Sequence, residues 1–358
     1  MNNEKTTIFA AGAVIGVIAS VLVLFGNPVN MGFCIACFIR DTAGALGMHR
    51  AAPVQYIRPE IIGIILGAFC MAFFHKEFAS RGGSAPMTRF TLGFFVMIGC
   101  LMFLGCPFRM IVRLAGGDLN AVLGLLGFFG GVLTGVFFLN KGFSLKRSYR
   151  LAAWDGYVLP AVQVVFLILL IAAPAFIFFS EEGPASKHAF WLISLLAGAA
   201  VGALAQRTRL CMAGGLRDVV LFKDYKLILG FAAVFAAALV TNVVLTLVTG
   251  TPYVNFGFAG QPVAHTDGLW NLLGMYLVGF AAILLGGCPL RQLVLSGEGN
   301  TDSQVTYLGL LVGAAFCHNF GLASSGEGPT ANGKIGVIVG ICVCLIIACL
   351  NTFKKGDK

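Results

Sequence analysis

Charged residues are scarce in this sequence. Only 11% of its 358 residues are Asp, Glu, Lys or Arg, whereas 58% are hydrophobic. A soluble domain has about 25% charged residues, and here the few charges cluster between long neutral runs. The composition therefore excludes an ordinary soluble protein and indicates an all-α polytopic membrane protein. In such a protein the net charge of +9 sets the orientation of loops in the lipid bilayer and does not indicate nucleic-acid binding.

Nucleotide-binding and metal-binding patterns are also missing. No G-x-x-x-x-G-K-[ST] loop occurs, so ATP-driven pumping by this chain alone is not supported. Cys34-x-x-Cys37 has zinc-ligand spacing, but a structural zinc site needs a second pair and none lies nearby. We predict no metal and no other cofactor. The histidines are scattered singly, as His49, His75, His188, His265 and His318.

The apolar runs predict about ten transmembrane helices. Crossing a hydrocarbon core of ~30 Å takes about 20 residues. The first run is followed by no small-residue cleavage pattern, so we predict a retained helix and not a signal peptide. The predicted spans are residues 7–25, 60–76, 89–105, 120–139, 157–179, 189–205, 228–249, 269–287, 304–322 and 335–353.

Four interruptions between the spans contain cysteine, glycine and arginine. They are too short and too polar to cross, and proline suits the first helical turn in two of them. Irregular backbone at membrane depth is tolerated only inside protein or beside a wet cavity. We therefore predict four short re-entrant helices, within residues 30–48, 106–118, 206–222 and 288–300.

The eleven cysteines divide into two groups. Five lie in apolar runs, where cysteine behaves as a small hydrophobic residue: Cys70, Cys317, Cys342, Cys344 and Cys349. The other six lie in or beside the interruptions and are the candidates for function: Cys34, Cys37, Cys100, Cys106, Cys211 and Cys288.

The interruptions repeat in order. Cys34 is followed by Arg40-Asp41. Cys211 lies 177 residues later and is followed by Arg217-Asp218 at the same spacing. The stretch GCPFR at 105–109 returns as GCPLR 182 residues later, at 287–291. Two matches in the same order at nearly one offset indicate a duplication.

The duplication predicts an inverted repeat. Residues 1–156 form the first half, 157–188 a connecting helix, and 189–358 the second half with a C-terminal helix. One extra crossing between halves turns the second copy upside down, which is a known transporter plan with its site near the midplane. Loop and terminal Lys and Arg number 17 on one side against 7 on the other, so both termini are predicted to be cytoplasmic.

The Cys-Pro-apolar-Arg motif favours an anion. Pro107 and Pro289 set the first turn of a short helix whose free N–H groups point toward the cysteine, and helix N-termini attract negative charge. Arg109 and Arg291 fall one turn along. Each arginine could instead anchor to lipid phosphate. Arg40-Asp41 and Arg217-Asp218 could pair with other helices, because adjacent helical residues do not face one another.

Two other functions compete with conduction of an anion. A membrane thiol-disulfide oxidoreductase could use Cys34-x-x-Cys37, but Cys37 has no counterpart in the second half. A soft-metal transporter would need more Met, His or carboxylate pairs than the sequence offers. A conduction path explains all four interruptions, so we predict a transporter and not an enzyme, with no catalytic residues.

At these residues the sequence resembles the YeeE/YedE family of bacterial inner-membrane sulfur transporters. The resemblance covers nearly the whole chain and rests on the Cys34 segment, GCPFR, RTRLCMAGGLRD at 207–218 and GCPLR. The segments GFCIACFIRD and LAGGDLNA look most like the YedE branch, which is associated with selenium.

The resemblance implies uptake of a reduced sulfur oxyanion, such as thiosulfate, or of a selenium species through an hourglass-shaped protein of the inner membrane. Cysteine thiols at the constrictions would pass the substrate along by hydrogen bonding, a role that falls on Cys34, Cys106 and Cys288, with Cys211 added by the repeat. A small cytosolic TusA-like sulfur carrier is the implied partner. The predicted site adds the supporting residues Arg40, Arg109, Arg217, Arg291, Pro107 and Pro289, with Cys37 and Cys100 as further candidates.

Overall fold

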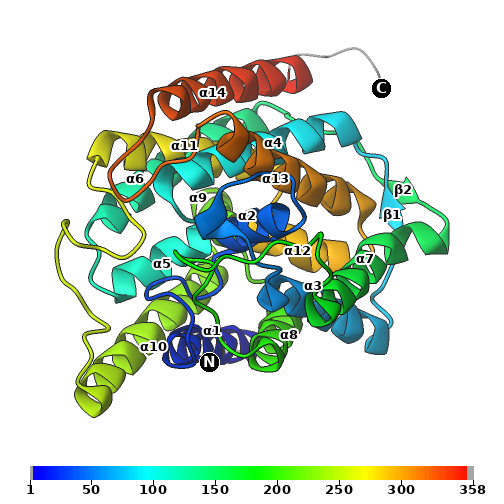
Figure 1. The fold of residues 1–358 in the computed structure, drawn as a ribbon. Coiled ribbons are helices and arrows are strands. Elements are labelled where there is room, and N and C mark those ends of the chain that lie inside the picture. Colours follow the sequence, from blue (N-terminus) through cyan, green and yellow to red (C-terminus); the bar gives the residue numbers. More distant parts are fainter. Residues whose placement is uncertain (1–2, 353–358) are drawn as a thin grey trace.

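The computed structural model describes residues 3–352, and nearly all of its regular structure is helical (Figure 1). Among the described residues, a single antiparallel pair of two-residue strands, β1 (Arg81–Gly82) and β2 (Tyr149–Arg150), joins two loops. The long helices are α1 (Asn3–Leu24), α3 (Pro59–Phe74), α4 (Pro86–Phe103), α6 (Asn120–Asn140), α7 (Ala153–Ala172), α8 (Trp191–Thr208), α10 (Lys226–Thr249), α11 (Gly268–Leu285), α13 (Thr301–Asn319) and α14 (Ala331–Thr352).

Every predicted span overlaps one of these long helices, which confirms the all-α prediction. The largest boundary error is in the fifth span, predicted over residues 157–179. Helix α7 ends at Ala172 because Ala173 turns left-handed, with φ +42°, and Pro174 cannot continue the helix. Residue 353, the last of the tenth span, lies outside the described residues.

Four short helices occupy the predicted interruptions, together with a 3-10 turn, η1 (Ala52–Val54). All eleven residues of the first short helix are buried. Figure 1 shows the four in the middle of the molecule, with long helices around them. They are α2 (Ile35–Ala45), α5 (Pro107–Ala115), α9 (Met212–Phe222) and α12 (Pro289–Gly297).

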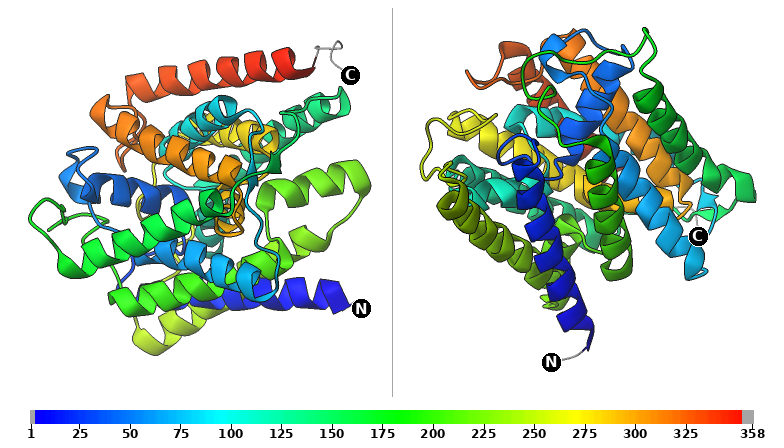
Figure 2. Two further views of the ribbon diagram at one scale, coloured as in Figure 1. Left: turned by 90° about the vertical axis from the view of Figure 1, so that its right-hand side faces the viewer. Right: turned by 60° about the horizontal axis from the view of Figure 1, so that its bottom comes forward.

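The long helices pack in close pairs. Helix α1 lies against α10, α3 against α8, α4 against α13, and α6 against α11, while α4 also contacts α11. Helix α7 covers α3 and α12, and α14 covers α4 and α11. In the left view of Figure 2 the long helices run roughly parallel, and α1 begins on the side where α14 ends. An even number of membrane crossings would place the start of α1 and the end of α14 on the same side in this way.

Composition supports membrane insertion of most of these helices. Nine segments within residues 3–352 are long and apolar enough to cross a membrane. Side chains on their outer faces are large and apolar, such as Leu247 and Val248, which are 79% and 76% exposed. Helix α13 is not among the nine. It buries polar residues such as Ser303 and Thr306 inside the protein, so its sequence is less apolar than that of a lipid-facing helix.

Glycines on one face of α6 bring its backbone close to α11. A Cβ at Gly127 would lie 2.0 Å from the carbonyl oxygen of Leu272, and a Cβ at Gly131 would lie 2.1 Å from that of Tyr276. Small residues spaced by four allow such close approach of membrane helices. The neighbouring Gly130 lies off this face, where an added Cβ would meet only the Tyr276 ring at 3.5 Å.

We expect Gly131→Ala to destabilise the protein and Gly130→Ala to be tolerated. The methyl group at position 131 would clash with backbone, which cannot move without separating the helices, and overpacking of this kind costs about 1–3 kcal/mol. Thermal unfolding of the two detergent-purified variants against wild type provides the measurement. Equal melting temperatures for both variants would show that the α6–α11 contact is not as close as described.

Candidate functional site

The four short helices share one local geometry. Each begins directly after a cysteine, and that cysteine is the N-cap. Two residues before each cysteine the backbone is left-handed, which reverses the chain so that the N-terminus of the short helix points into the protein. Leucine and arginine rarely adopt this conformation, yet they occupy two of the four positions. The values of φ are +50° at Gly32, +59° at Leu104, +55° at Arg209 and +84° at Gly286.

The cysteines meet in two pairs. Cys34 and Cys106 form the first thiol pair, in which the two side chains lie close enough to interact electrostatically. Cys211 and Cys288 form the second thiol pair, with their sulfur atoms 3.7 Å apart. All four side chains are buried, with exposed fractions of 4% or less. Within residues 3–352 no hydrogen bond joins a thiol of one pair to a thiol of the other.

Each pair combines two kinds of cysteine. Cys34 and Cys211 cap their helices through sulfur, which accepts the N–H of Cys37 at 3.4 Å and of Gly214 at 3.2 Å. Cys106 and Cys288 make no such side-chain cap, and Pro107 and Pro289 stand in the first helical turn, as predicted. Two helix N-termini therefore converge at each pair, and their partial positive charges favour an anion there.

The two further candidate cysteines lie beside the first thiol pair. The Cys37 thiol contacts Cys34 and donates weakly to the carbonyl oxygen of Leu104 at 3.9 Å. Cys100, on α4, interacts electrostatically with both Cys34 and Cys37. The second thiol pair has no further cysteines beside it in the described chain, so the two halves of the repeat differ in their chemistry.

Arg109 carries a buried positive charge at the first pair. Its side chain is fully buried, and Nη1 donates to the Cys37 sulfur at 3.6 Å and to the carbonyl oxygen of Leu104. Its remaining donors reach carbonyl oxygens of Asn30, Pro262 and Val263. Among residues 3–352 no carboxylate pairs with it. Burying an uncompensated charge is costly, so the first pair offers a strong attraction to an anion.

The corresponding arginine of the second pair is compensated. Arg291 forms an ion pair with Glu298 at 3.0 Å, and its side chain is 14% exposed. The two Gly-Cys-Pro motifs thus differ in net charge although their backbones match.

The adjacent Arg-Asp residues pair with each other, which corrects one expectation. Arg40 Nη2 lies 2.7 Å from Asp41 Oδ1, and Arg217 Nη2 lies 2.8 Å from Asp218 Oδ1. The long arginine side chain can fold back along the helix to reach its neighbour, so separate partners are not required. Asp41 additionally binds Arg58 at 2.7 Å, through side chains that are fully buried. Two cations share one carboxylate, and this cluster keeps a net positive charge.

Some buried charges near the site carry no sequence motif. Arg58 contacts Asp41, and its Nη atoms donate to the carbonyl oxygens of Lys187 and Pro184 in the loop before α8. Arg113 pairs with Asp118 at 2.6 Å and lies over the Phe103 ring. Their only sequence signal is a charge within a mostly apolar chain, where intramembrane ionisable residues are expensive.

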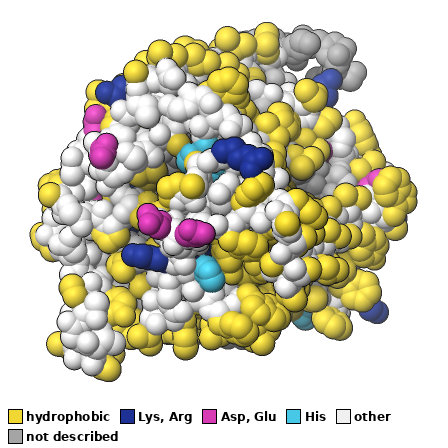
Figure 3. Space-filling model, in the orientation of Figure 1, with side chains coloured by type: hydrophobic (Ala, Val, Ile, Leu, Met, Phe, Trp, Pro, Cys, Tyr) yellow, Lys and Arg dark blue, Asp and Glu magenta, His cyan; other side chains and the backbone are white. Residues whose placement is uncertain are grey.

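A cavity of about 420 Å³ opens beside the turn that precedes Cys106, and we call it the His318 cavity. Arg40 and Leu104, the residue two before Cys106, lie in its wall. The face drawn in Figure 3 carries few charged side chains and shows a hollow with a histidine beside basic side chains. The cavity is lined by Arg40, Ala51, Pro53, Val54, Leu104, Pro184, Val263, His318, Ala323, Ser324, Ser325 and Gly326.

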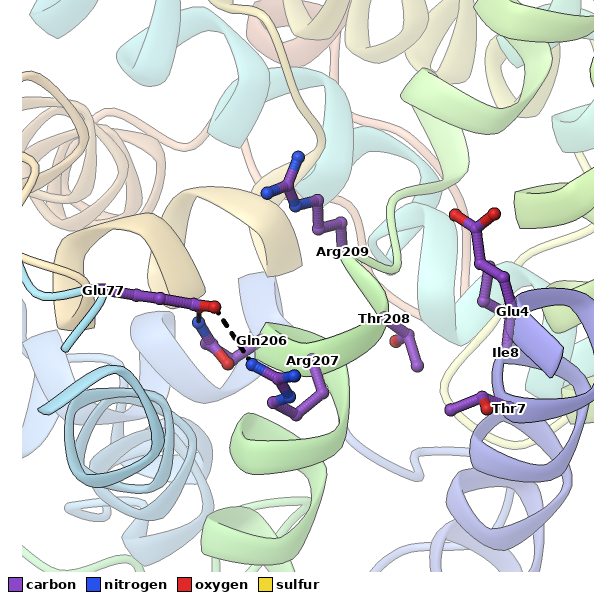
Figure 4. A pocket seen from close by; sticks show the side chains of 8 residues that line it. All are labelled: Glu4, Thr7, Ile8, Glu77, Gln206, Arg207, Thr208 and Arg209. Carbon is purple, nitrogen blue, oxygen red and sulfur yellow. Dashed lines mark hydrogen bonds and ion pairs between the residues drawn. The ribbon is translucent and has the colours of Figure 1, made fainter. Parts of the chain in front are cut away.

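A second cavity, of about 360 Å³, opens beside the turn that precedes Cys211, and we call it the Arg207 cavity. Arg209, two residues before Cys211, lies in its wall. Figure 4 shows Gln206 and Arg207 turned toward Glu77, while Arg209 points away from them. The hydrogen bond from Gln206 and the charge of Arg207 lower the pKa of Glu77. The lining residues are Glu4, Thr7, Ile8, Glu77, Gln206, Arg207, Thr208 and Arg209.

The two cavities lie at opposite ends of the same helices. Pro53 and Val54 of the His318 cavity precede α3, whereas Glu77 of the Arg207 cavity follows it. A helix of 16 residues is about 24 Å long. The two cavities therefore lie on opposite sides of the molecule.

No cluster of three or more His, Cys, Asp or Glu side chains suited to a metal ion occurs within residues 3–352. In the described chain the cysteines around Cys34 and Cys37 are thus not placed to hold a metal ion together. The arrangement suits an anion held by hydrogen bonds from thiols and by helix N-termini.

Comparisons with known proteins agree with this chemistry. Thiosulfate transporter TsuA of Escherichia coli (strain K12) is 29% identical over 125 residues, which are 35% of this chain and 33% of that protein. The chain spans about a third of the length of this curated relative. Residues 207–350, which include both motifs of the second half, match the family model described as sulphur transport. The matches therefore support the resemblance of the chain to YeeE/YedE sulphur transporters over this region.

Proposed function

We propose that the protein is a membrane transporter that takes up a small reduced sulfur anion, with thiosulfate as the first candidate. The observation that carries the proposal is the meeting of two helix N-termini at each buried thiol pair. Two cavities, whose walls contain the residues two before Cys106 and Cys211, lie on opposite sides of the molecule. The family match of residues 207–350 and the likeness to a thiosulfate transporter support it.

The thiol pairs are proposed to act as two gates. At 3.7 Å the sulfur atoms of Cys211 and Cys288 are in van der Waals contact, so no anion passes between them without a movement of α9 or α12. Thiols are weak donors and soft acceptors. They can thus bind a sulfur-bearing anion weakly and release it again, as conduction requires. In this scheme Cys34 and Cys106 receive the anion, and Cys211 and Cys288 release it.

The gates are proposed to belong to two inverted halves, residues 1–156 and 189–358. The packing of helices supports this, because equivalent helices of the two halves make equivalent contacts. The contact of α1 with α10 has its counterpart in that of α8 with α3. The contact of α4 with α13 has its counterpart in that of α11 with α6. The shared left-handed turn before each cysteine supports it too. With both termini in the cytoplasm of a bacterium, the His318 cavity faces outward from the inner membrane and the Arg207 cavity faces inward.

Two finer assignments follow from the sequence resemblance. The Arg207 cavity is the proposed place of delivery to a cytosolic TusA-like sulfur carrier. A selenium species is the alternative cargo, because selenium is larger and more polarizable than sulfur and a thiol-lined path can hold either.

Uptake into membrane vesicles tests the function and the cargo together. We expect vesicles that contain the protein to accumulate labelled thiosulfate well above vesicles from cells that lack it. Labelled selenite and selenide are measured in parallel, and stronger accumulation of either one would assign the cargo to selenium. No accumulation of any of the three, with the protein present in the membrane, would refute the proposal.

A membrane thiol-disulfide oxidoreductase is the second candidate, because Cys34 and Cys37 are in contact. The variants Cys37→Ala and Cys288→Ala separate the two functions. An oxidoreductase needs Cys37 and tolerates loss of Cys288, whereas the transporter shows the reverse pattern in growth on thiosulfate. Stoichiometric zinc or copper in the purified protein would favour the third candidate, a soft-metal transporter.

A further inference from the structure

His318 lines the His318 cavity, and a second histidine, His49, packs against it; the proposed thiol path uses neither. The rings of His49 and His318 are stacked, with centroids 4.5 Å apart. Both nitrogens of His49 are occupied: Nδ1 accepts the N–H of Ala51 at 3.3 Å, which assigns the proton to Nε2, and Nε2 donates to the carbonyl oxygen of Arg40 at 3.1 Å. Burial lowers the pKa of His49, which keeps it neutral. His49 therefore positions its neighbours and has no donor left for a ligand.

His318 differs from His49 in its hydrogen bonding. It lines the cavity, yet its Nε2 is buried and has no hydrogen-bond partner within residues 3–352. Buried polar groups in proteins are normally hydrogen bonded, so each exception calls for an explanation. A ligand in the cavity, accompanied by a small rotation of the ring, would supply the missing partner.

Arg40 supplies charge to the same cavity. Its side chain is 3% exposed, and its Nε and Nη2 donate to Asp41 Oδ1 at 3.0 and 2.7 Å. No hydrogen bond in the described chain uses its Nη1. Asp41 is shared with Arg58, so it does not neutralise both arginines. An arginine with an unused donor beside an unpartnered histidine is suited to a charged oxygen acceptor.

We propose that the His318 cavity is a docking site for a tetrahedral oxyanion, in which Arg40 and His318 bind oxygen atoms before the anion reaches the first thiol pair. The site rests on the proposed function and deepens it. Its wall also contains Ser324 and Ser325, and about 420 Å³ is ample for an anion of five heavy atoms. Leu104 lies in the wall of this site and precedes Cys106 by two residues, and Cys106 belongs to the thiol pair that is proposed to recognise the sulfur atom. The His318 cavity thus recognises the charge and the oxygen atoms of the anion first, and the first thiol pair recognises its sulfur atom second.

This order predicts that sulfate competes with thiosulfate. Both are tetrahedral dianions, but sulfate lacks the terminal sulfur that the thiols recognise. We expect excess sulfate to inhibit labelled thiosulfate uptake competitively without itself accumulating in the vesicles.

His318→Phe removes the nitrogens and keeps a ring to stack on His49. We expect it to raise the KM for thiosulfate uptake about tenfold, as for loss of one hydrogen bond to a charged group. Vmax should change little, and sulfate inhibition should weaken in parallel. His318→Gln, which retains a donor and an acceptor, should recover some of the affinity. Amounts of each variant in the membrane are measured alongside.

His188→Phe is the matched control. His188 is also stacked on an aromatic ring, that of Tyr56 at 4.0 Å, but it lines neither cavity. Unchanged KM in His318→Phe, or absence of sulfate competition in wild type, would overturn the docking site while leaving transport intact. Absence of thiosulfate uptake by wild type would instead refute the proposed function itself.

Discussion

Cys106→Ala is expected to slow thiosulfate uptake strongly, and Cys288→Ala to do the same from the other half of the chain. Each substitution removes one thiol of a pair in which a second thiol, two helix N-termini and the anion meet. Losing a hydrogen bond to an ion costs about 1.5–3 kcal/mol, which corresponds to a rate lower by roughly 10- to 100-fold for each gate. The initial rate of labelled thiosulfate uptake, normalised to protein in the vesicle membrane, measures the effect.

Two cysteines outside the path are suitable controls. Cys344 on α14 and Cys317 on α13 are fully buried, as the path cysteines are, so their replacement by alanine has a similar cost in packing. Cys344→Ala and Cys317→Ala should keep most of the uptake. If Cys106→Ala and Cys288→Ala transport as well as these controls, the thiol pairs are structural and the anion crosses elsewhere.

The sequence predicted the helices of this fold well, for a physical reason. Within a bilayer each span must be long, apolar and helical, so composition alone locates α1 or α14. The four short helices were also predictable, because a cysteine followed by proline, or by a segment with arginine and aspartate, cannot be a lipid-facing span. Helix α7 was misjudged because Pro174 lies within an apolar run.

The pairing of the cysteines could not be predicted. The repeat indicated four equivalent positions, but which thiols meet depends on how α2, α5, α9 and α12 cross one another, and no local pattern encodes those crossings. The isolation of Arg109 from any carboxylate is likewise a property of the packed chain. From the sequence no role was predicted for His318, because no other candidate residue lies near it along the chain. It gains importance only when α13 brings it beside Arg40 and His49.

Oxidative cross-linking of the second thiol pair is expected to stop uptake completely and reversibly. The sulfur atoms of Cys211 and Cys288 are 3.7 Å apart, and a disulfide of about 2.05 Å needs only a small approach of α9 and α12. Copper phenanthroline transfers the two electrons of the thiols to oxygen, and two protons are released as the bond forms. The bond would consume both thiols and fix the two helix N-termini together, which closes the gate. Dithiothreitol should restore uptake.

Peptide mass spectrometry identifies the bond and separates it from a bond between Cys34 and Cys106, whose thiols are also in contact. Uptake should fall in proportion to the fraction of protein that carries the Cys211–Cys288 bond. Cys211→Ala cannot form this bond. Cross-linked protein that still transports at the wild-type rate would show that the anion does not pass between these sulfur atoms. The contact at the second pair would then serve only to hold α9 against α12.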